Sequence, residues 1–223
     1  MAARARSDGD GRVERGNQTR RLILKRSVDT ASVEGLEGLS LGRLAAELQL
    51  SKSGVFALFG SKVDLQLATV RAAIAIYVEH VVLPPHELPP GLGRLWRVCT
   101  SWLRYSRGRV FPGGCFFYAV SAEYDAREGP VHEALAAARA DWTGFLERTV
   151  REAQRVGEVR AEVDGPQLVF EMIALMELAN AESVMHGDDG YYDKATKGII
   201  TRLRDAAVDP TLLPEASSPS DVG

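Results

Sequence analysis

Cysteine is scarce in this chain of 223 residues, which contains only Cys99 and Cys115. The two are sixteen residues apart, outside any CxxC motif, and no histidine is spaced to complete a zinc site with them. The four histidines are scattered and form no HExxH or HxxxH arrangement. The sequence therefore excludes a disulfide scaffold, and we predict no metal site.

Long hydrophobic runs are also missing. Charges interrupt the longest apolar stretches, as Glu171 and Glu177 do in residues 168–181, so none reaches the ~18 residues that a membrane span needs. The first twenty residues are polar and rich in arginine, without the apolar core of a secretory signal. No P-loop, GxGxxG or G-x-S-x-G motif is present. We expect a cytoplasmic protein with no membrane partner, no cofactor and no catalytic residues.

The small net charge of −3 hides an asymmetry. Residues 1–62 carry eleven Lys and Arg against seven Asp and Glu, whereas the rest carries sixteen against 23. A basic end of +4 on an acidic body of −7 indicates that this end meets a polyanion such as nucleic acid. The alternative is a basic disordered tail, which is common in proteins.

No alternating run is long enough for a strand, and apolar residues recur at helical spacing throughout. We predict an all-α protein of about nine helices, with ends marked by Ser, Gly and Pro. The expected parts are a disordered basic arm (1–16), an N-terminal domain of short helices (17–65), a larger C-terminal helical domain (66–208) and a flexible tail (209–223).

Two short predicted helices, Ser40 to Leu48 and Lys52 to Phe59, are joined by a tight turn, as in a helix-turn-helix. Four apolar residues would lock the pair together: Leu44, Ala45, Val55 and Phe59. The second helix would lie in the major groove and leave five residues near the bases: Ser53, Gly54, Phe56, Ala57 and Leu58. Three short helices also occur in ordinary helical proteins, so this pattern alone is weakly specific.

The segment from Ser51 to Lys62, SKSGVFALFGSK, followed by Asp64-Leu65, resembles the signature S-K-G-T-L-Y-x-H-F-x-S-K-x-x-L of the tetracycline-repressor (TetR) family. Residues 40–45, SLGRLA, are similar to the T/S-V-x-x-I-A helix before it. The resemblance covers about residues 18–67. It implies a homodimer that places its N-terminal domains in successive major grooves of a palindromic operator, with C-terminal helices that dimerise and bind a small-molecule inducer.

Carried over by position, the resemblance implies that Ser40, Lys52 and Lys62 contact phosphates, which supply affinity and register rather than sequence choice. Three residues depart from the family pattern. Phe56 replaces the usual Tyr and keeps only a ring that packs on a sugar or a thymine methyl, and Leu58 replaces the usual His. Gln49 stands where a glycine is usual, so we expect it to adopt positive φ.

The segment Gly113 to Phe117 also resembles a stretch in one branch of the family, near the inducer pocket. We predict a pocket wall with Glu123 as its polar anchor, because ligand pockets are mostly apolar with few polar groups. The other predicted wall residues are Trp96, Trp102, Cys115, Phe117, Tyr118 and Trp142. The alternative is that aromatics at helical spacing simply form core.

The helix that opens at Asp164 is apolar over most of its circumference, so it should be buried on two sides. One side faces its own domain, and the other is most simply covered by a second copy in a C2 four-helix interface. The predicted interface residues are Met172, Leu175, Met176, Tyr192, Ile199, Ile200 and Leu203. A central helix buried inside a monomer is the alternative.

Together these features predict a ligand-responsive DNA-binding transcriptional regulator, released from its operator by an inducer and most often a repressor in the resembled family. The alternative from another class is a helical small-molecule-binding protein or enzyme that has lost DNA recognition. The replacements at Gln49, Phe56 and Leu58 motivate that alternative.

Overall fold

The computed structural model describes residues 2–214, with side chains from residue 14 onward, and this part of the chain forms nine α-helices without a β-sheet. Their bounds are α1 (Ala2–Glu34), α2 (Leu41–Glu47), α3 (Lys52–Phe59), α4 (Lys62–Tyr77), α5 (Leu92–Arg107), α6 (Phe116–Tyr124), α7 (Pro130–Arg155), α8 (Gly165–His186) and α9 (Gly190–Ala206). The predicted all-α class is confirmed.

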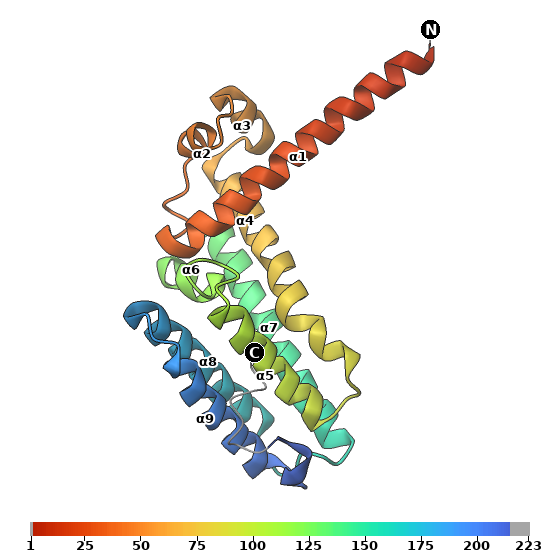
Figure 1. The fold of residues 1–223 in the computed structure, drawn as a ribbon, viewed down its shortest axis with the longest axis vertical. Coiled ribbons are helices and arrows are strands. Elements are labelled where there is room, and N and C mark those ends of the chain that lie inside the picture. The colour runs from red at the N-terminus through yellow and green to blue at the C-terminus, as the bar shows by residue number, and fades with distance from the viewer. Residues whose placement is uncertain (1, 215–223) are drawn as a thin grey trace.

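Helix α1 is longer than predicted. Residues 1–16 were expected to be a disordered arm, but the helix already begins at Ala2, and its first turns extend away from the rest of the molecule (Figure 1). The packed part of α1 is anchored by the buried Ile23, Val28 and Ala31. Adding residues to an existing helix is far easier than nucleating one, and no proline in residues 1–16 stops the extension.

Helix α4 joins the N-terminal helices to the body and contacts both α1 and α7. It continues into a π-helical turn (Val78–Val82) and a 3-10 turn (Pro84–Glu87), where two prolines end the helical path. The stretch Lys62–Glu87 is long and apolar enough to cross a membrane by length and composition alone. A core helix of a soluble protein meets the same criterion, and α4 packs within the helical body.

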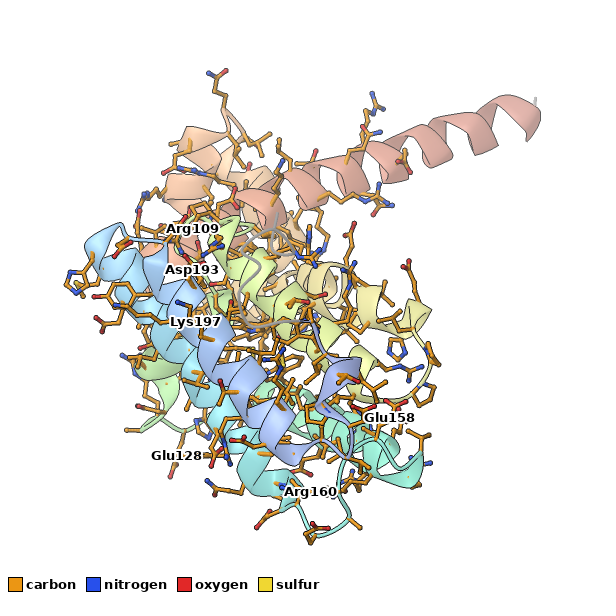
Figure 2. The ribbon with its side chains drawn as sticks, turned by 60° about the horizontal axis from the view of Figure 1, so that its bottom comes forward. Arg109, Glu128, Glu158, Arg160, Asp193 and Lys197 are labelled. Carbon is orange, nitrogen blue, oxygen red and sulfur yellow. The ribbon has the colours of Figure 1, made fainter. Side chains whose placement is uncertain are left out.

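Helices α5 to α9 form the body, in which α5 contacts α7, α8 and α9, and α8 lies alongside α9 (Figure 1). Figure 2 places Arg109 and Asp193 near one end of α9 and Arg160 near the other. At that second end the Arg160 amide donates to the Ala206 carbonyl at 3.0 Å. Both ends of α9 are therefore fastened to the rest of the body.

The predicted flexible tail, 209–223, begins later than expected. Residues 210–212 form a 3-10 turn, and the Leu213 side chain is only 4% exposed. Arg204 also donates a hydrogen bond to the carbonyl of Pro214. These contacts hold residues 209–214 against α9, and residues 215–223 of the predicted tail lie outside the described residues.

Candidate DNA-binding surface and ligand cavity

Serine caps set the starts of both helices in the helix-turn-helix. The Ser40 hydroxyl accepts a hydrogen bond from the Arg43 amide at 3.4 Å, and the Ser51 hydroxyl accepts one from the Gly54 amide at 3.1 Å. Such bonds satisfy amides that have no partner inside the helix. Gln49 lies between the helices with φ = 55°, the left-handed conformation predicted for it.

The interior of this unit agrees with the predicted pattern. Leu44 and Ala45 of α2 pack with Val55 and Phe59 of α3, and each is at most 5% exposed. The outer face of α3 is exposed at Lys52, Ser53, Gly54, Phe56 and Ala57. Phe56 has 52% of its surface accessible although it is apolar, which is unusual for a large aromatic side chain.

Leu58 lies differently from the prediction. It is half-buried against the core, and its carbonyl accepts a hydrogen bond from the Arg20 guanidinium at 2.7 Å. The same guanidinium lies over the Phe59 ring, 4.5 Å from its centroid. The Arg20 side chain of α1 therefore links the first helix to the end of α3 at Leu58 and Phe59.

Most cations of the helix-turn-helix are engaged by the chain itself. Arg43 pairs with Glu34 and, at 2.7 Å, with Glu47. Arg26 binds the second carboxylate oxygen of Glu47, also at 2.7 Å. These hydrogen bonds lower the pKa of both carboxyl groups. Lys52 differs, because within residues 14–214 its ammonium has no ion-pair or hydrogen-bond partner.

The Glu37 carboxylate, between α1 and α2, collects donors from both halves of the molecule. Lys62, at the start of α4, donates to it at 3.0 Å and to the Glu37 carbonyl at 2.7 Å. The Tyr124 hydroxyl of α6 donates to it at 2.7 Å and Gln66 of α4 at 3.3 Å. Arg127 lies 3.4 Å away. These donors lower the pKa of Glu37 to about 2, with the Tyr124 bond as the largest cause.

Two further contacts join α1 to the loop and helix around α6. The Glu123 carboxylate accepts a hydrogen bond from the Leu36 amide at 2.7 Å, and the Gly113 amide donates to the Ser32 hydroxyl at 3.1 Å. Glu123 therefore does not lie in the ligand cavity as predicted. It satisfies the amide of Leu36, two residues past the end of α1 and outside the hydrogen-bond ladder of that helix.

We expect Tyr124→Phe to destabilise the protein by about 1–2 kcal/mol at pH 7, because it removes the donor to Glu37 and the acceptor of a Gln66 bond. A carboxyl group with a lowered pKa stabilises the fold above its unfolded pKa and loses that effect as pH falls through its folded value. The deficit of the variant should therefore shrink between about pH 4.5 and 2. Urea unfolding across this range measures it, with Tyr118→Phe, an exposed hydroxyl on the same helix, as control. If Tyr124→Phe lowers the free energy of unfolding by the same amount at every pH, the hydrogen bond between Tyr124 and the Glu37 carboxylate is contradicted.

A cavity of about 250 Å³ lies between α4, α5, α6, α7 and α8. Five aromatic side chains line it: Tyr77, Trp102, Phe117, Trp142 and Phe145. Tyr77 is the centre of this group, because Phe117 and Trp142 both meet its ring edge-on, with centroids 5.5 and 5.3 Å away. Apolar walls with few polar groups are typical of small-molecule sites.

The polar groups deepest in this cavity are uncharged. Burial raises the pKa of the Cys115 thiol to about 11 and raises that of the Tyr77 hydroxyl well above its usual value. A thiol of this kind is protonated at neutral pH and is a poor nucleophile. Cys115 therefore contributes an uncharged thiol to the wall of the cavity.

The comparisons with known proteins agree with this arrangement. Residues 91–199 match the family model "Tetracyclin repressor-like, C-terminal domain". A TetR transcriptional regulator from Chloroflexus aurantiacus J-10-FL superposes with a TM-score of 0.81 at 22% identity, over 87% of this chain and 98% of that chain. A TetR-family regulator from Cytophaga hutchinsonii gives 0.78 at 21% identity, with the same coverage. Residues 91–199 of this chain therefore match the TetR-type C-terminal domain, and the described chain has the fold of TetR-family regulators.

A further TetR-like structure, AibR in complex with isovaleryl coenzyme A and operator DNA, has a TM-score of 0.61 at 18% identity and covers 73% of this chain and 85% of that chain. The curated proteins contain no match to the chain. The predicted family is therefore confirmed by the C-terminal domain and by the whole fold, which includes the helix-turn-helix.

The chain places six of the predicted pocket residues in three locations. Trp102, Cys115, Phe117 and Trp142 line the inner cavity, whereas Tyr118 lines a separate outer cavity beside α6. Trp96 packs half-buried against the core and lines neither. The sequence did not predict the lining residues at the end of α4 and just after it, which are Ile74, Tyr77 and Val78. Their i, i+3, i+4 spacing marks a buried stripe, but nothing in the sequence distinguishes a stripe facing a cavity from one facing solid core.

The predicted dimer residues lie mostly inside the single chain. Six of the seven are at most 3% exposed and Leu175 is half-buried, because α5 and α8 cover one face of α9 within the same chain. Met176 lines the inner cavity. The exposed apolar face of α8 is a different one, and its most exposed members are Phe170 at 68%, Leu178 at 60% and Met185 at 78%. We call these three residues the α8 stripe.

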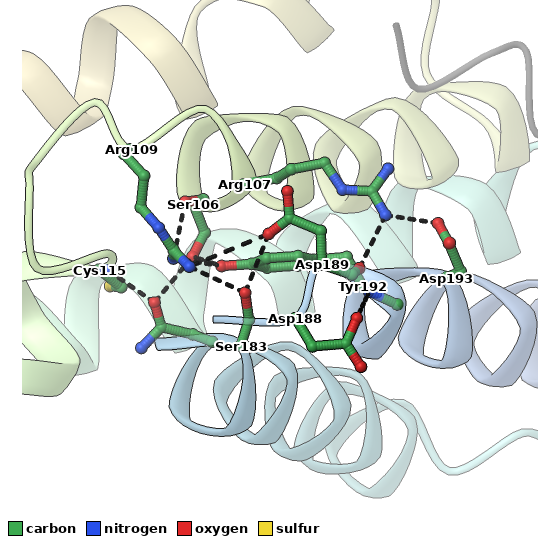
Figure 3. A network of polar contacts seen from close by, with 11 residues as sticks. Ser106, Arg107, Arg109, Cys115, Ser183, Asp188, Asp189, Tyr192 and Asp193 are labelled. Carbon is green, nitrogen blue, oxygen red and sulfur yellow. Dashed lines mark hydrogen bonds and ion pairs between the residues drawn. The ribbon is translucent and has the colours of Figure 1, made fainter. Parts of the chain in front are cut away.

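A buried polar network fixes the α5–α6 loop to the junction of α8 and α9 (Figure 3). The Asn180 side-chain oxygen accepts hydrogen bonds from the Ser106 hydroxyl and the Cys115 amide, both at 2.8 Å. The Tyr192 hydroxyl is 2.8 Å from Ser106 and accepts from Arg109 at 3.0 Å. Polar groups buried this deeply are costly unless satisfied, so the network holds one side of the cavity in a single arrangement.

Proposed function

We propose that this TetR-family protein is a dimeric, DNA-binding transcriptional repressor that leaves a palindromic operator when a small molecule occupies the inner cavity. The observation that carries the proposal is the Glu37 carboxylate, which binds Lys62 of the DNA-binding half and Tyr124 of α6 at the same time. Tyr124 also lines the outer cavity beside α6. A change in the ligand-binding half therefore has a direct polar route to the helix-turn-helix.

The outer face of α3 would enter the major groove, with Lys52 on a phosphate and Phe56 and Ala57 near base edges. Two such helices bind DNA when they stand about one helical turn apart, roughly 34–36 Å. Helix α4 both carries the helix-turn-helix and forms one wall of the cavity, so a ligand there tilts α4 and changes that spacing. The ligand shifts this equilibrium only by its differential affinity for the two states.

We expect Lys52→Ala to weaken binding to all duplexes alike and to reduce the salt slope by about one, because a phosphate contact carries no sequence information. Lys62→Ala should act in the same direction but less, since Lys62 must leave Glu37 to reach a phosphate. Fluorescence anisotropy on a random duplex at several salt concentrations measures both. Lys197→Ala on the exposed face of α9 is the matched control (Figure 2). If Lys52→Ala leaves the salt dependence of DNA affinity unchanged, Lys52 does not contact a phosphate.

The deciding experiment is selection of random duplex DNA on the purified full-length protein at near-physiological salt. A palindromic enriched motif is expected, and its half-site spacing tests the dimer geometry. No enrichment from a folded protein would favour the second candidate, a cytoplasmic ligand-binding protein without DNA recognition. The internal engagement of Arg20, Arg43 and Lys62 favours that candidate, because it leaves fewer free cations for phosphates.

A further inference from the structure

The ion pair between Arg139 of α7 and Glu177 of α8, 2.9 Å long, stands where three cavities meet. Both residues line the inner cavity, and both also line two outer ones. One outer cavity, of about 450 Å³, lies beside α6 and includes Tyr118 and Tyr124. The other, of about 530 Å³, lies along α8 and includes Phe170. The Arg139–Glu177 pair therefore lies between the aromatic inner cavity and both outer cavities.

The lining of the inner cavity carries no net charge. Besides Arg139 and Glu177 it contains one more acid and one more base, Asp141 and Arg148, both exposed to solvent on α7. The rest of the lining is aromatic or aliphatic, apart from the Cys115 thiol and the Tyr77 hydroxyl. A charged ligand inside would lie unpaired among rings, which is costly in an apolar site. Otherwise it would have to compete for one partner of the ion pair, whose Arg139 and Glu177 side chains are 43% and 27% exposed at the edge of the cavity.

The size of the cavity sets the size of the ligand. Apolar cavities of about 150 Å³ accept benzene. The inner cavity has about 250 Å³, which adds space for a second fused ring. Its ring edges and faces suit a flat aromatic molecule, because offset and edge-to-face contacts stabilise aromatic pairs.

We propose that the inner cavity selects uncharged aromatic molecules of about two fused rings, and that the Arg139–Glu177 pair determines this choice. The inference rests on the proposed function in one respect only, that the cavity takes a small-molecule ligand. Breaking the pair from either side should then create a charge preference. Arg139→Gln leaves the Glu177 carboxylate free for a cation, and Glu177→Gln leaves the Arg139 guanidinium free for an anion.

The test uses three ligands with the same naphthalene ring and different charge: 2-naphthalenemethanol, 2-naphthoate and 2-naphthylmethylammonium. Binding to the full-length protein is followed through tryptophan fluorescence, because two of its three tryptophans, Trp102 and Trp142, line the cavity. We expect the alcohol to bind about tenfold or more tighter than either ion. Arg139→Gln should tighten the ammonium about fivefold, and Glu177→Gln should tighten the carboxylate by a similar factor.

Arg151→Gln is the matched control, because it removes an exposed ion pair with Glu147 on the same helix, away from the inner cavity. It should leave the order of the three ligands unchanged. The proposal is overturned if either ion binds the unmodified protein as tightly as the alcohol, if none of the three binds, or if both cavity variants keep the original order. These ligand-binding measurements need no DNA. A negative result here is therefore distinct from a failure of the protein to select an operator.

Discussion

If the protein is the dimer proposed above, Leu178→Glu is expected to convert it into a monomer and to lower operator affinity about 100-fold or more, because two linked half-site contacts exceed one by about 10²–10⁴. Leu178 belongs to the α8 stripe, whose three members stand eight and seven residues apart and so share one face of the helix. An exposed apolar face of this kind marks a protein contact. In a two-fold interface, Leu178→Glu would bury one carboxylate from each copy, and neither would have a partner of opposite charge.

Sedimentation velocity at micromolar concentration measures the assembly, and anisotropy with the selected operator measures the affinity. Since Leu178 is 60% exposed within the single chain, its replacement leaves the core intact, and the variant should keep its helical circular dichroism. Val156→Glu, at an apolar residue 52% exposed just past the end of α7, is the control and should remain dimeric. A Leu178→Glu variant that still sediments as a dimer would place the interface elsewhere.

The α8 stripe illustrates what periodicity leaves undecided. Helix α8 is apolar on most sides, so its sequence indicates burial on two faces without saying which neighbour covers each. The structure places Met172 and Met176 inside the chain and Phe170 and Leu178 outside. Helix ends could be predicted far better. The Ser40 and Ser51 hydroxyls accept from the amides three residues further along the chain, so the signal is local.

Contacts between residues far apart in the sequence, unlike helix ends, could not be predicted from the sequence. Glu123 binds the Leu36 amide 87 residues away, and Lys62 binds Glu37 across a turn and two helices. The sequence marks Glu123 as a candidate polar group of the pocket and Lys62 as a candidate phosphate contact. A carboxylate, however, accepts a hydrogen bond from a backbone amide as readily as from a ligand. Which partner it takes depends on how the α1 end and α6 pack together. That packing is set by the tertiary fold, so neither local pattern nor family position could assign it.

Gly113→Ala is expected to destabilise the protein by about 2–4 kcal/mol, because overpacking that forces the backbone to shift costs this much. A Cβ atom at Gly113 would lie 1.8 Å from the Ser32 carbonyl oxygen. That oxygen belongs to the main chain of α1 and cannot turn aside as a flexible side chain does. The α5–α6 loop must therefore move away from α1, which also breaks the bond from the Gly113 amide to the Ser32 hydroxyl.

Thermal unfolding measures the effect, and the midpoint should fall by about 5–15 °C for a chain of this size. Gly93→Ala is the matched control, because a Cβ there meets no atom within 4 Å and alanine is a better helix former than glycine in the first turn of α5. That variant should melt at or slightly above the unmodified protein, so the two Gly→Ala changes have opposite signs. A midpoint for Gly113→Ala within about 2 °C of the unmodified protein would mean that the loop does not press on α1. The junction between the DNA-binding and ligand-binding halves would then depend on the Glu37 and Glu123 hydrogen bonds and on the packing of α1 against α4 and α6.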